Sequence, residues 1–205
     1  MLKVIYHDGT DRFAKEYASL HRMRKRVFRD RLGWNVNVIN GMEFDQFDTP
    51  YAVNLVYQDK LNEVRGATRL SPTTVPYMLG DVFPQLVKGD VIRDANVWES
   101  TRFGGDSHAP KNITAILIAG MLEFGLSIGL TNYVSVSDTR MEPLFKRVGW
   151  MPDRLGGTID TGTDISAGEL FYVGERYLEY VRKKNKLPRD IITNLGDYLD
   201  VSHIK

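Results

Sequence analysis

The sequence predicts a mixed α/β fold built as one domain. Strand, helix, strand and helix patterns follow one another along the chain, an order that indicates sheet and helix layers around a common core. The strand–helix–strand unit at 97–138 could form a parallel crossover. The chain has 205 residues, 42% of them hydrophobic and 26% charged, which is ordinary for one sizeable globular domain. No repeat, low-complexity tract or linker divides it, so we expect a single domain over 1–205.

The N-terminal part is expected to hold one strand and one long helix. A short strand pattern occupies 2–7, and a helix is predicted over 11–31. Thr10 could cap this helix, and Gly33 lies just past its end. Residues 35–50 show neither a helical nor a strand period, so we expect them to be irregular.

The middle of the chain is predicted to form paired strands followed by helical turns. Residues 51–58 and 63–71 have strand patterns joined by a short turn. Residues 75–87 predict short helical turns, and 96–105 predicts the next strand. The most hydrophobic segment follows, and we expect a helix over 110–130.

The remaining elements complete the alternation of strands and helices. Strand patterns lie at 132–138 and 168–175, with a short helix predicted over 139–149 between them. A helix over 176–186 leads into the C-terminal tail, which we expect to be helical over 185–205.

The missing residue types and motifs narrow the possible chemistry. The chain has no Cys, which excludes a disulfide framework, a thiolate zinc site and a Cys nucleophile. It has no phosphate loop ending in G-K-[ST] and no H-E-x-x-H motif. The four histidines form no pattern that suggests a triad. If acyl groups are transferred, direct attack by a bound nucleophile is therefore favoured over a covalent acyl-enzyme.

Charge and hydropathy argue against nucleic acid and membrane partners. The net charge of +1 creates no global field for nucleic acid. The basic run RMRKR at 22–26 lacks interleaved aromatic residues and favours a solvated face. The longest apolar run, 113–130, contains Glu123 and fits a buried helix better than a membrane span. The first residues lack a signal-peptide pattern, and we expect a cytoplasmic protein.

Arg24 breaks the apolar pattern of the first helix. Spacings of four and three define a helix face made of Phe13, Tyr17, Leu20, Arg24 and Val27. An arginine on a buried face costs free energy unless an anion pairs with it. Alternatively, Arg24 extends outward along its aliphatic stem. The helical period alone does not decide between these two interpretations.

Three acids cluster in the segment GMEFDQFD, at Glu43, Asp45 and Asp48. They could face a cationic ligand, or they could belong to a polar surface loop. We expect no metal, because the calcium-loop pattern is missing and no His accompanies the acids. Trp34, directly after Gly33, is either a core residue or a stacking surface for a cation.

The stretch NVWESTRFGG at 96–105 places opposite charges in a strand that should be half buried. Strict alternation puts Glu99 on one face and Arg102 on the other. The two side chains then cannot reach one ligand unless a β-bulge re-aims one of them, and bulges favour active sites. The stretch therefore indicates either two separate partners or a bulge at a cleft. Arg69, late in the strand before it, has the position of an ordinary surface arginine.

Taken together, these residues resemble the acyl-homoserine-lactone synthases, the autoinducer synthases of bacterial quorum sensing. The resemblance covers about residues 4–175. The segments that carry it are RMRKRVFRDRLGW, EFDQFDTPYAVNLV, GATRLSPT, WESTRF and SDTRMEPLFKRVGW. The residues that match in order and spacing are Arg24, Phe28, Trp34, Asp45, Asp48, Arg69, Phe83, Glu99 and Arg102.

The resemblance implies an α/β fold that is N-acetyltransferase-like (GNAT-like). Such a fold has a mixed twisted sheet flanked by helices, with a V-shaped cleft between two splayed parallel strands, here 97–103 and 132–138. The implied activity is acyl transfer from acyl-carrier protein or CoA to the α-amine of S-adenosylmethionine. The methionine carboxylate then displaces methylthioadenosine and closes the lactone. S-adenosylmethionine is a substrate here, so no cofactor is expected.

The resemblance also implies three catalytic residues, Glu99, Asp48 and Arg102. Glu99, or a water that it holds, would take the amine proton before attack. Arg102 would bind the methionine carboxylate, and Asp48 would face the amine together with Asp45. A backbone N–H freed where the strands splay would stabilise the oxyanion.

The remaining S-adenosylmethionine site is implied to be aromatic and charged. Phe28 and Trp34 would face the sulfonium, and Arg24 is a second candidate for the carboxylate. The implied binding residues are Arg24, Phe28, Trp34, Met42, Asp45, Arg69, Phe83 and Phe103.

An apolar acyl pocket is expected between the sheet and helix 110–130. In the family, a hydroxyl on the second cleft strand tends to accompany oxygenated acyl chains, and Ser135 and Ser137 are the nearest hydroxyls. The apolar candidates could equally be ordinary core residues. The expected pocket residues are Ile116, Met121, Leu122, Leu144, Ser135 and Ser137.

A basic group near the second half of the cleft offers a docking site for an acidic carrier protein. It consists of Lys146, Arg147 and Arg154. The same residues could be no more than a solvated helix end.

Two other functions fit parts of the sequence. A GNAT-like acyl-CoA N-acyltransferase acting on another amine would explain the cleft. It would not explain the set Arg24, Phe28, Trp34 and Asp45. A non-catalytic module that binds a ligand or a carrier protein would require a degenerate site, whereas the charged residues form a complete set.

Overall fold

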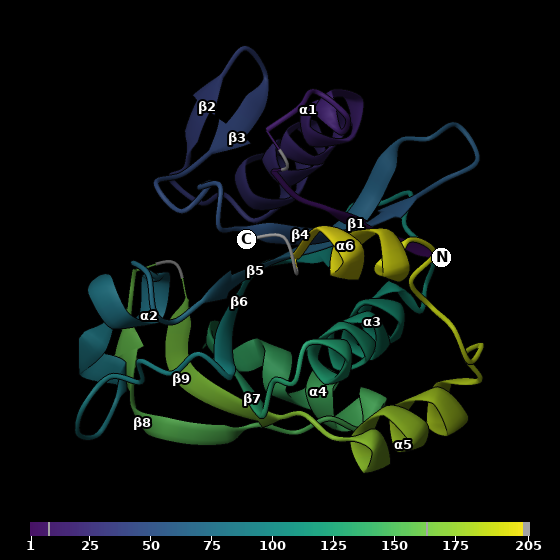
Figure 1. Cartoon of the computed structure of the whole chain (residues 1–205). Coiled ribbons are helices and arrows are strands. Elements are labelled where there is room, and N and C mark those ends of the chain that lie inside the picture. The colour runs from purple at the N-terminus through teal and green to yellow at the C-terminus, as the bar shows by residue number, and fades with distance from the viewer. Residues whose placement is uncertain (8, 163, 203–205) are drawn as a thin grey trace.

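The computed structural model describes residues 1–7, 9–162 and 164–202. Its centre is a seven-stranded sheet in the order β1-β4-β5-β6-β7-β9-β8, with helices on both faces (Figure 1). Among the described strands, β6 and β7 pair in parallel and the other neighbours in this sheet pair antiparallel. The strands are β1 (Leu2–Ile5), β4 (Val53–Gln58), β5 (Val64–Pro72), β6 (Val97–Gly105), β7 (Asn132–Asp138), β8 (Asp153–Asp160) and β9 (Ile165–Tyr172).

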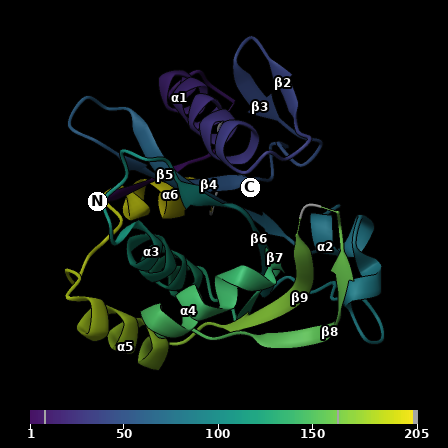
Figure 2. The ribbon, with the colours of Figure 1, turned by 180° about the vertical axis from the view of Figure 1, so that it is seen from behind.

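The helices divide between the two faces of this sheet. In Figures 1 and 2, α1 and the small hairpin β2–β3 lie on one side of β4 and β5, and α3 lies on the other. The hairpin consists of β2 (Asn37–Ile39) and β3 (Met42–Phe44). The helical segments are α1 (Ala14–Arg24), the π-helical η1 (Lys25–Arg31), α2 (Met78–Asp81), η2 (Pro84–Leu86), α3 (Ile113–Ser127), η3 (Thr139–Met141), α4 (Glu142–Val148), α5 (Glu175–Asn185) and α6 (Leu195–Ser202).

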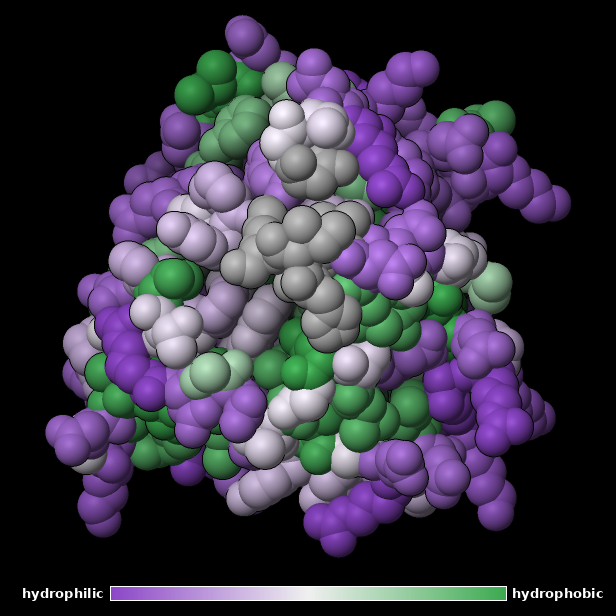
Figure 3. All heavy atoms as spheres, in the orientation of Figure 1, coloured by the Kyte–Doolittle hydropathy of each residue, from purple (hydrophilic) through white to green (hydrophobic). Residues whose placement is uncertain are grey.

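Helix α3 supplies much of the hydrophobic core. Leu117, Ile118 and Leu122 are completely buried, and Gly120 brings the helix so close to β1 that an added Cβ would collide with Leu2. In Figure 3, hydrophobic residues gather over the lower middle of one face, near α3, while hydrophilic residues surround them. Among the described helices, none combines the length and apolar character that crossing a membrane requires.

The structure corrects three local predictions in the N-terminal half. The first helix begins at Ala14 rather than Asp11, and Thr10 accepts a hydrogen bond from the Arg12 N–H instead of capping it. Residues 35–50 are not wholly irregular, because they contain the β2–β3 hairpin. Its turn residues Asn40 and Gly41 both have positive φ, as an Asn-Gly hairpin turn requires.

The strand β8 was not expected from its sequence, DRLGGTID. Its register with β9 shifts between Arg154 and Thr158, and the two glycines between them weaken any strand pattern. The other predicted strands and helices are present, with ends displaced by a few residues. The tail predicted to be helical over 185–205 is helical only in part: residues 186–194 are not helical and α6 supplies the helix that follows. Residues 203–205 of the predicted tail lie outside the described residues.

The cleft predicted between the parallel strands is present. β6 and β7 pair only over Val97–Asn132, Trp98–Tyr133 and Glu99–Val134. Beyond these pairs, both strands continue without a common register, β6 to Gly105 and β7 to Asp138. The strands therefore diverge in a V whose apex lies next to Glu99.

A β-bulge lies on β6 inside this cleft. The register with β5 changes between Ala67–Gly104 and Arg69–Thr101, so Arg102 and Phe103 together oppose one residue of β5. Arg102 has φ +52°, a left-handed conformation that costs about 1 kcal/mol or more for a residue with a side chain. The bulge turns the Arg102 side chain toward α1. It therefore lies on the same face of the sheet as the side chains of Glu99 and Thr101. Of the two interpretations of this stretch, the bulge at a cleft is confirmed.

The C-terminal tail is fixed to the core through Glu123 of α3. The Glu123 carboxylate accepts hydrogen bonds from the N–H groups of Ile191 and Ile192, at 3.0 and 3.1 Å, and from Arg182 at 2.6 Å. Ile192 also forms a bridge with Leu2 of β1. The charge that interrupts the apolar run at 113–130 thus serves to attach the tail.

We expect Glu123→Ala to destabilise the fold by about 2–4 kcal/mol, because it leaves two buried amide groups and a guanidinium without their partner. The free energy of unfolding from urea titrations measures the effect. Glu179→Ala is the control, since Glu179 is exposed on α5, and it should change stability by less than about 0.5 kcal/mol. Equal stabilities of the two variants would contradict this role of Glu123.

Candidate active site

A buried ion-pair network joins α1, the β2–β3 hairpin and the central sheet. Three arginines meet three acids, so their formal charges balance. The arginines are Arg24 of α1, Arg69 of β5 and Arg102 of β6, and the acids are Glu43, Asp45 and Asp48.

Arg24 lies at the closed side of this network. Its Nε donates to Glu43 Oε2 at 2.5 Å, and its Nη1 and Nη2 donate to the two oxygens of Asp48 at 2.6 and 3.0 Å. The side chain is 1% exposed. The interpretation that Arg24 extends outward is therefore wrong, and the pairing of a buried arginine with anions is confirmed.

Arg69 forms the second bridge and is also 1% exposed, so the expectation of a surface arginine is wrong. Its Nη1 and Nη2 donate to the two oxygens of Asp45, at 2.5 and 3.0 Å. Nη1 also reaches Asp48 at 2.8 Å. Its Nε donates to Thr101 Oγ1 at 3.0 Å, so a β6 hydroxyl that the sequence did not single out orients the guanidinium.

Arg102 is the most accessible arginine of the three, with 9% of its side chain exposed. Its Nη2 lies 2.7 Å from Asp45 and 3.0 Å from Glu43, and its guanidinium carbon lies 5.4 Å from the centre of the Phe28 ring. Glu43, completely buried, connects Arg102 to Arg24. The sequence placed Glu43 in an acid cluster but gave it no role.

The network keeps Asp45 and Asp48 ionised. Burial is the largest influence on Asp45 and Asp48, and by itself it would raise their pKa. Hydrogen bonds and positive charge from Arg69 at Asp45, and from Arg24 and Arg69 at Asp48, outweigh burial and lower the pKa of both acids. Asp45 and Asp48 therefore carry negative charge at neutral pH.

Glu99 lies on the same face of the sheet but in a different environment. Its carboxyl accepts hydrogen bonds from the N–H groups of Met78 and Leu79, at 2.9 and 2.6 Å, and the residue is 2% exposed. Burial is the dominant influence and raises the pKa of Glu99 to about 7, although these two hydrogen bonds oppose the shift. A carboxyl with such a pKa can exchange a proton near neutral pH.

Two cavities share Arg102 as a wall residue. The first, of about 420 Å³, is lined by Asp45, Met78, Phe83 and Arg102 among others. Met78 connects it to Glu99, to which its N–H donates. The second cavity, of about 340 Å³, lies between the splayed strands and α3. Arg102 lines both, so a ligand in either cavity would contact its side chain.

The second cavity contains the aromatic residues and the serines expected at the site. Phe28 and Trp34 stack with ring centres 5.1 Å apart, and both line the cavity together with Phe103. Of the six expected acyl-pocket residues, the cavity wall includes Met121, Ser135 and Ser137. The wall also includes residues that the sequence did not single out, among them Ile118, Met141, Phe145, Trp150 and Phe171.

Three expected acyl-pocket residues, Ile116, Leu122 and Leu144, do not line this cavity. Leu122 is completely buried in the main hydrophobic core, and Ile116 packs against that core. The apolar pattern of a helix identifies its buried faces but not the face that borders a cavity, because both contain the same residue types.

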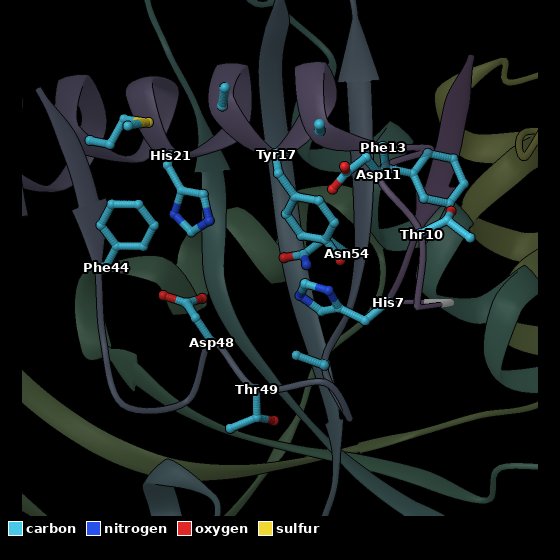
Figure 4. A pocket seen from close by; sticks show the side chains of 14 residues that line it. His7, Thr10, Asp11, Phe13, Tyr17, His21, Phe44, Asp48, Thr49 and Asn54 are labelled. Atoms are coloured by element: carbon cyan, nitrogen blue, oxygen red, sulfur yellow. The ribbon is translucent and has the colours of Figure 1, made fainter. Parts of the chain in front are cut away.

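Met42 and Asp48 line a separate cavity of about 430 Å³, on the other side of the network. Figure 4 shows Asp48 there with the rings of Tyr17, His21 and Phe44. Asp48 thus joins the network to this cavity, while Arg24, Arg69 and Glu99 are enclosed and line none of the three. The implied S-adenosylmethionine residues are therefore divided between cavities and buried positions.

The basic group predicted for docking is partly occupied by internal contacts. Lys146 and Arg147 are exposed at the end of α4, whereas Nε and Nη2 of Arg154 both bind Glu142. Lys184 of α5 donates to the Lys146 carbonyl at 3.2 Å, which brings another cation to the same surface. In the part of the chain that is described, no group of three or more His, Asp or Glu side chains could hold a metal ion.

Comparison with known proteins shows the family of this chain. The family described as autoinducer synthase matches residues 8–173. An acyl-homoserine-lactone synthase of Agrobacterium fabrum is 34% identical over 173 residues, which cover 80% of this chain and 82% of that protein. The chain belongs to the autoinducer synthase family, and the resemblance inferred from its motifs is confirmed.

Solved structures confirm the predicted fold class. The CoA-dependent acyl-homoserine lactone synthase BjaI, solved with S-adenosylmethionine and isopentyl-CoA, superposes with a TM-score of 0.85 at 23% identity, covering 94% of this chain and 92% of that one. An N-acetyltransferase described as putative, from Lactobacillus plantarum, superposes with a TM-score of 0.58 at 14% identity, covering 84% and 99%. The fold is thus GNAT-like.

We expect Arg24→Met to destabilise the fold by about 3–5 kcal/mol, because it removes a buried cation between Glu43 and Asp48. The pKa of Asp48 in the folded protein lies below its ordinary value of 3.8. The contribution of the Arg24–Asp48 ion pair to stability is therefore present above about pH 4 and is lost as the pH falls further. Urea titrations at neutral and acidic pH should therefore show that the difference in free energy of unfolding between Arg24→Met and wild type becomes smaller in acid.

Arg22→Met is the matched control for this prediction. Arg22 lies two residues earlier on α1 but is exposed, so its removal should leave stability within about 0.5 kcal/mol. A similar small effect of Arg24→Met would mean that the network does not hold α1 to the hairpin.

Proposed function

We propose that this chain is an acyl-homoserine-lactone synthase and thereby makes a quorum-sensing signal. It would transfer an acyl group from a thioester to the amine of S-adenosylmethionine and then close the lactone with release of methylthioadenosine. The position of Arg102 between two cavities carries the proposal, because the reaction needs two substrates whose reacting atoms meet. The family membership and the activity named for the Agrobacterium fabrum relative support it.

The first cavity and the aromatic end of the second would hold S-adenosylmethionine. Arg102 would bind the methionine carboxylate through a charge-assisted contact, and Asp45 would attract the amine. Phe28 and Trp34 would present their ring faces to the sulfonium. Arg24, Arg69 and Asp48 would fix Asp45 and Arg102 in place, since each is already bound within the network.

Glu99 is the candidate base. The α-amine must lose a proton before it attacks the thioester carbonyl, and a carboxyl with a pKa of about 7 accepts protons efficiently near neutral pH. Because Glu99 is enclosed, we expect the proton to pass through a water beside Met78. N–H groups of β6 left without partners where β7 diverges would stabilise the oxyanion.

The acyl chain would extend from this point into the second cavity. Both reacting groups come from the substrates, so we expect no bound cofactor. We also expect the reaction to take place in the cytoplasm. Lys146, Arg147 and Lys184 form a basic surface that would suit an acidic carrier protein. The donor is either acyl-carrier protein or CoA, because the phosphates of CoA would suit the same cations.

One assay tests the activity against its alternatives. The chain is incubated with S-adenosylmethionine and a panel of acyl-carrier-protein and acyl-CoA thioesters, and mass spectrometry looks for methylthioadenosine and a lactone. We expect both products from at least one donor. An amide product without lactone would favour the acyl-CoA N-acyltransferase, and the absence of turnover with every donor would favour a binding module.

Glu99→Gln should lower kcat on the order of 10²–10⁴-fold, with KM changed only a few-fold, because the amide cannot take a proton. In the wild type, kcat should rise with pH through about 7 as Glu99 ionises, and the variant should lose this rise. Steady-state rates across the pH range measure both effects. Glu175→Gln, an exposed change on α5, is the control, and unchanged turnover in Glu99→Gln would remove Glu99 from the mechanism.

Arg102→Ala should lower kcat/KM for S-adenosylmethionine on the order of 100-fold, since a charge-assisted contact to the carboxylate is lost. The protein should stay folded, because Asp45 still binds Arg69 and Glu43 still binds Arg24. Circular dichroism and thermal melting check the fold beside the rate measurement. Unfolding of the variant would make Arg102 structural and would weaken its assignment to the substrate.

A further inference from the structure

Glu169, in the middle of β9, is a buried acid that the proposed reaction does not use. The residue is completely buried, and neither of its carboxyl oxygens makes a hydrogen bond of normal geometry. Burial dominates and raises its pKa to about 7, although the Ser137 hydroxyl is close enough to lower it. A buried carboxyl without a firm partner is costly, so its position requires a reason.

The strand register places Glu169 behind the polar part of the second cavity. Glu169 lies opposite Ser135 of β7 and shares a sheet face with Phe171, which lines the cavity. The hydroxyls of Ser135 and Ser137 lie 3.2 Å apart, and both residues line the same cavity. Glu169, which does not itself line the cavity, thus lies beside the two serines at one corner of a pocket whose wall also contains Ile118, Met121, Phe145 and Trp150.

An ion pair with Arg154 would be the simplest structural role for Glu169, but the structure does not show one. Arg154 of β8 is the cross-strand neighbour of Glu169, yet its Nε and Nη2 both bind Glu142, at 2.8 and 2.5 Å. The Arg154 guanidinium is therefore turned toward Glu142, the first residue of α4, and not toward Glu169. Glu169 is left facing the serine pair.

The protonation of Glu169 determines what the serine pair can offer to the cavity. Each hydroxyl has one hydrogen, and one serine uses it to bind the other. If Glu169 is ionised, it accepts the remaining hydrogen, and the cavity faces oxygen lone pairs. If Glu169 is protonated, it donates its own hydrogen to the pair, and a serine hydrogen is left to point into the cavity.

Building on the acyl transfer proposed above, we propose that Glu169 is a positioning residue that sets the hydrogen-bonding direction of the Ser135–Ser137 pair toward an oxygen on the acyl chain. Protonated Glu169 makes the pair a donor, which suits a ketone. Ionised Glu169 makes it an acceptor, which suits a hydroxyl group. An unsubstituted chain leaves these buried groups unpaired and is disfavoured in both cases.

The other charged groups near this corner keep their charge near neutral pH or are already paired. Arginines stay protonated, and the hydrogen bond from Arg140 lowers the pKa of Asp138. Glu142 is bound to Arg154, and no histidine lines the cavity. The charged groups that face the corner are Glu142 from α4, Arg154 from β8, Asp138 from the end of β7, Arg140 from η3, Arg31 from η1 and Arg102 from β6.

The test compares three acyl thioesters of one chain length that carry a ketone, a hydroxyl group or no substituent on the third carbon. Carrier-protein and CoA thioesters are used in parallel, and kcat/KM is measured about one pH unit below and above 7. The ratio of ketone to hydroxyl donor should fall about tenfold from the acidic to the alkaline condition. Taking this ratio cancels the ionisation of Glu99, which affects all donors equally.

Two variants and one control separate positioning from a purely structural role. Glu169→Leu should abolish the pH dependence of the ratio and reduce the preference for oxygenated donors about tenfold or more. Glu169→Gln, which keeps the shape and cannot ionise, should also make the ratio independent of pH and covers the case in which the leucine variant does not fold. Glu179→Gln, exposed on α5, should behave as wild type.

The outcomes are distinguishable. A ratio that depends on pH in the same way in wild type and Glu169→Gln would overturn the proposal, as would equal losses with all three donors in Glu169→Leu. If the wild type forms lactone from no thioester at all, the proposed synthase function fails and this inference fails with it.

Discussion

The arrangement of the site depends on the need to neutralise three buried guanidinium groups. Burying one unpaired charge costs several kcal/mol, and Arg24 and Arg69 are each 1% exposed. The three carboxylates that solve this problem all come from one short segment, the β3 strand and the loop after it. That segment must therefore lie between α1 and the sheet. The outer, more exposed part of Arg102 remains close to two cavities.

The splayed strands separate two kinds of chemistry on opposite faces of the sheet. Glu99, at the apex, faces α2 together with the charged network, whereas Ser135 faces α3 and the apolar cavity. The bulge at Arg102 brings a charged group from β6 to the network face without breaking the strand, which still pairs with β5 at Gly104. Arg102 can thus be reached both from the charged network, which suits a polar substrate, and from the apolar cavity, which suits an acyl chain.

The sequence predicted the features of the site that conflict with a local pattern. Arg24 on an apolar helix face and Arg102 in a half-buried strand are anomalies, because each requires a partner or a bulge, and both requirements are met. Glu43 was assigned no role, because residues 35–50 were expected to be irregular and no buried face could be assigned to them. The limits of the cavity could not be predicted either. Ile118 borders the cavity and Leu122 is packed in the core, and only tertiary packing distinguishes them. The strand β8 was missed because its glycines hide its period.

The bulge also has a consequence for how this chain could change over evolution. β6 carries one residue more than its neighbour β5 needs, and the surplus lies at Arg102 and Phe103. Loss of a single codon there would restore a regular ladder, because Val97 and Trp98 at the start of the strand would keep their partners. The hydrophobic interior would survive, while the guanidinium would disappear or point to the opposite face. A deletion of one residue could thus give a protein that still folds but lacks the proposed synthase activity.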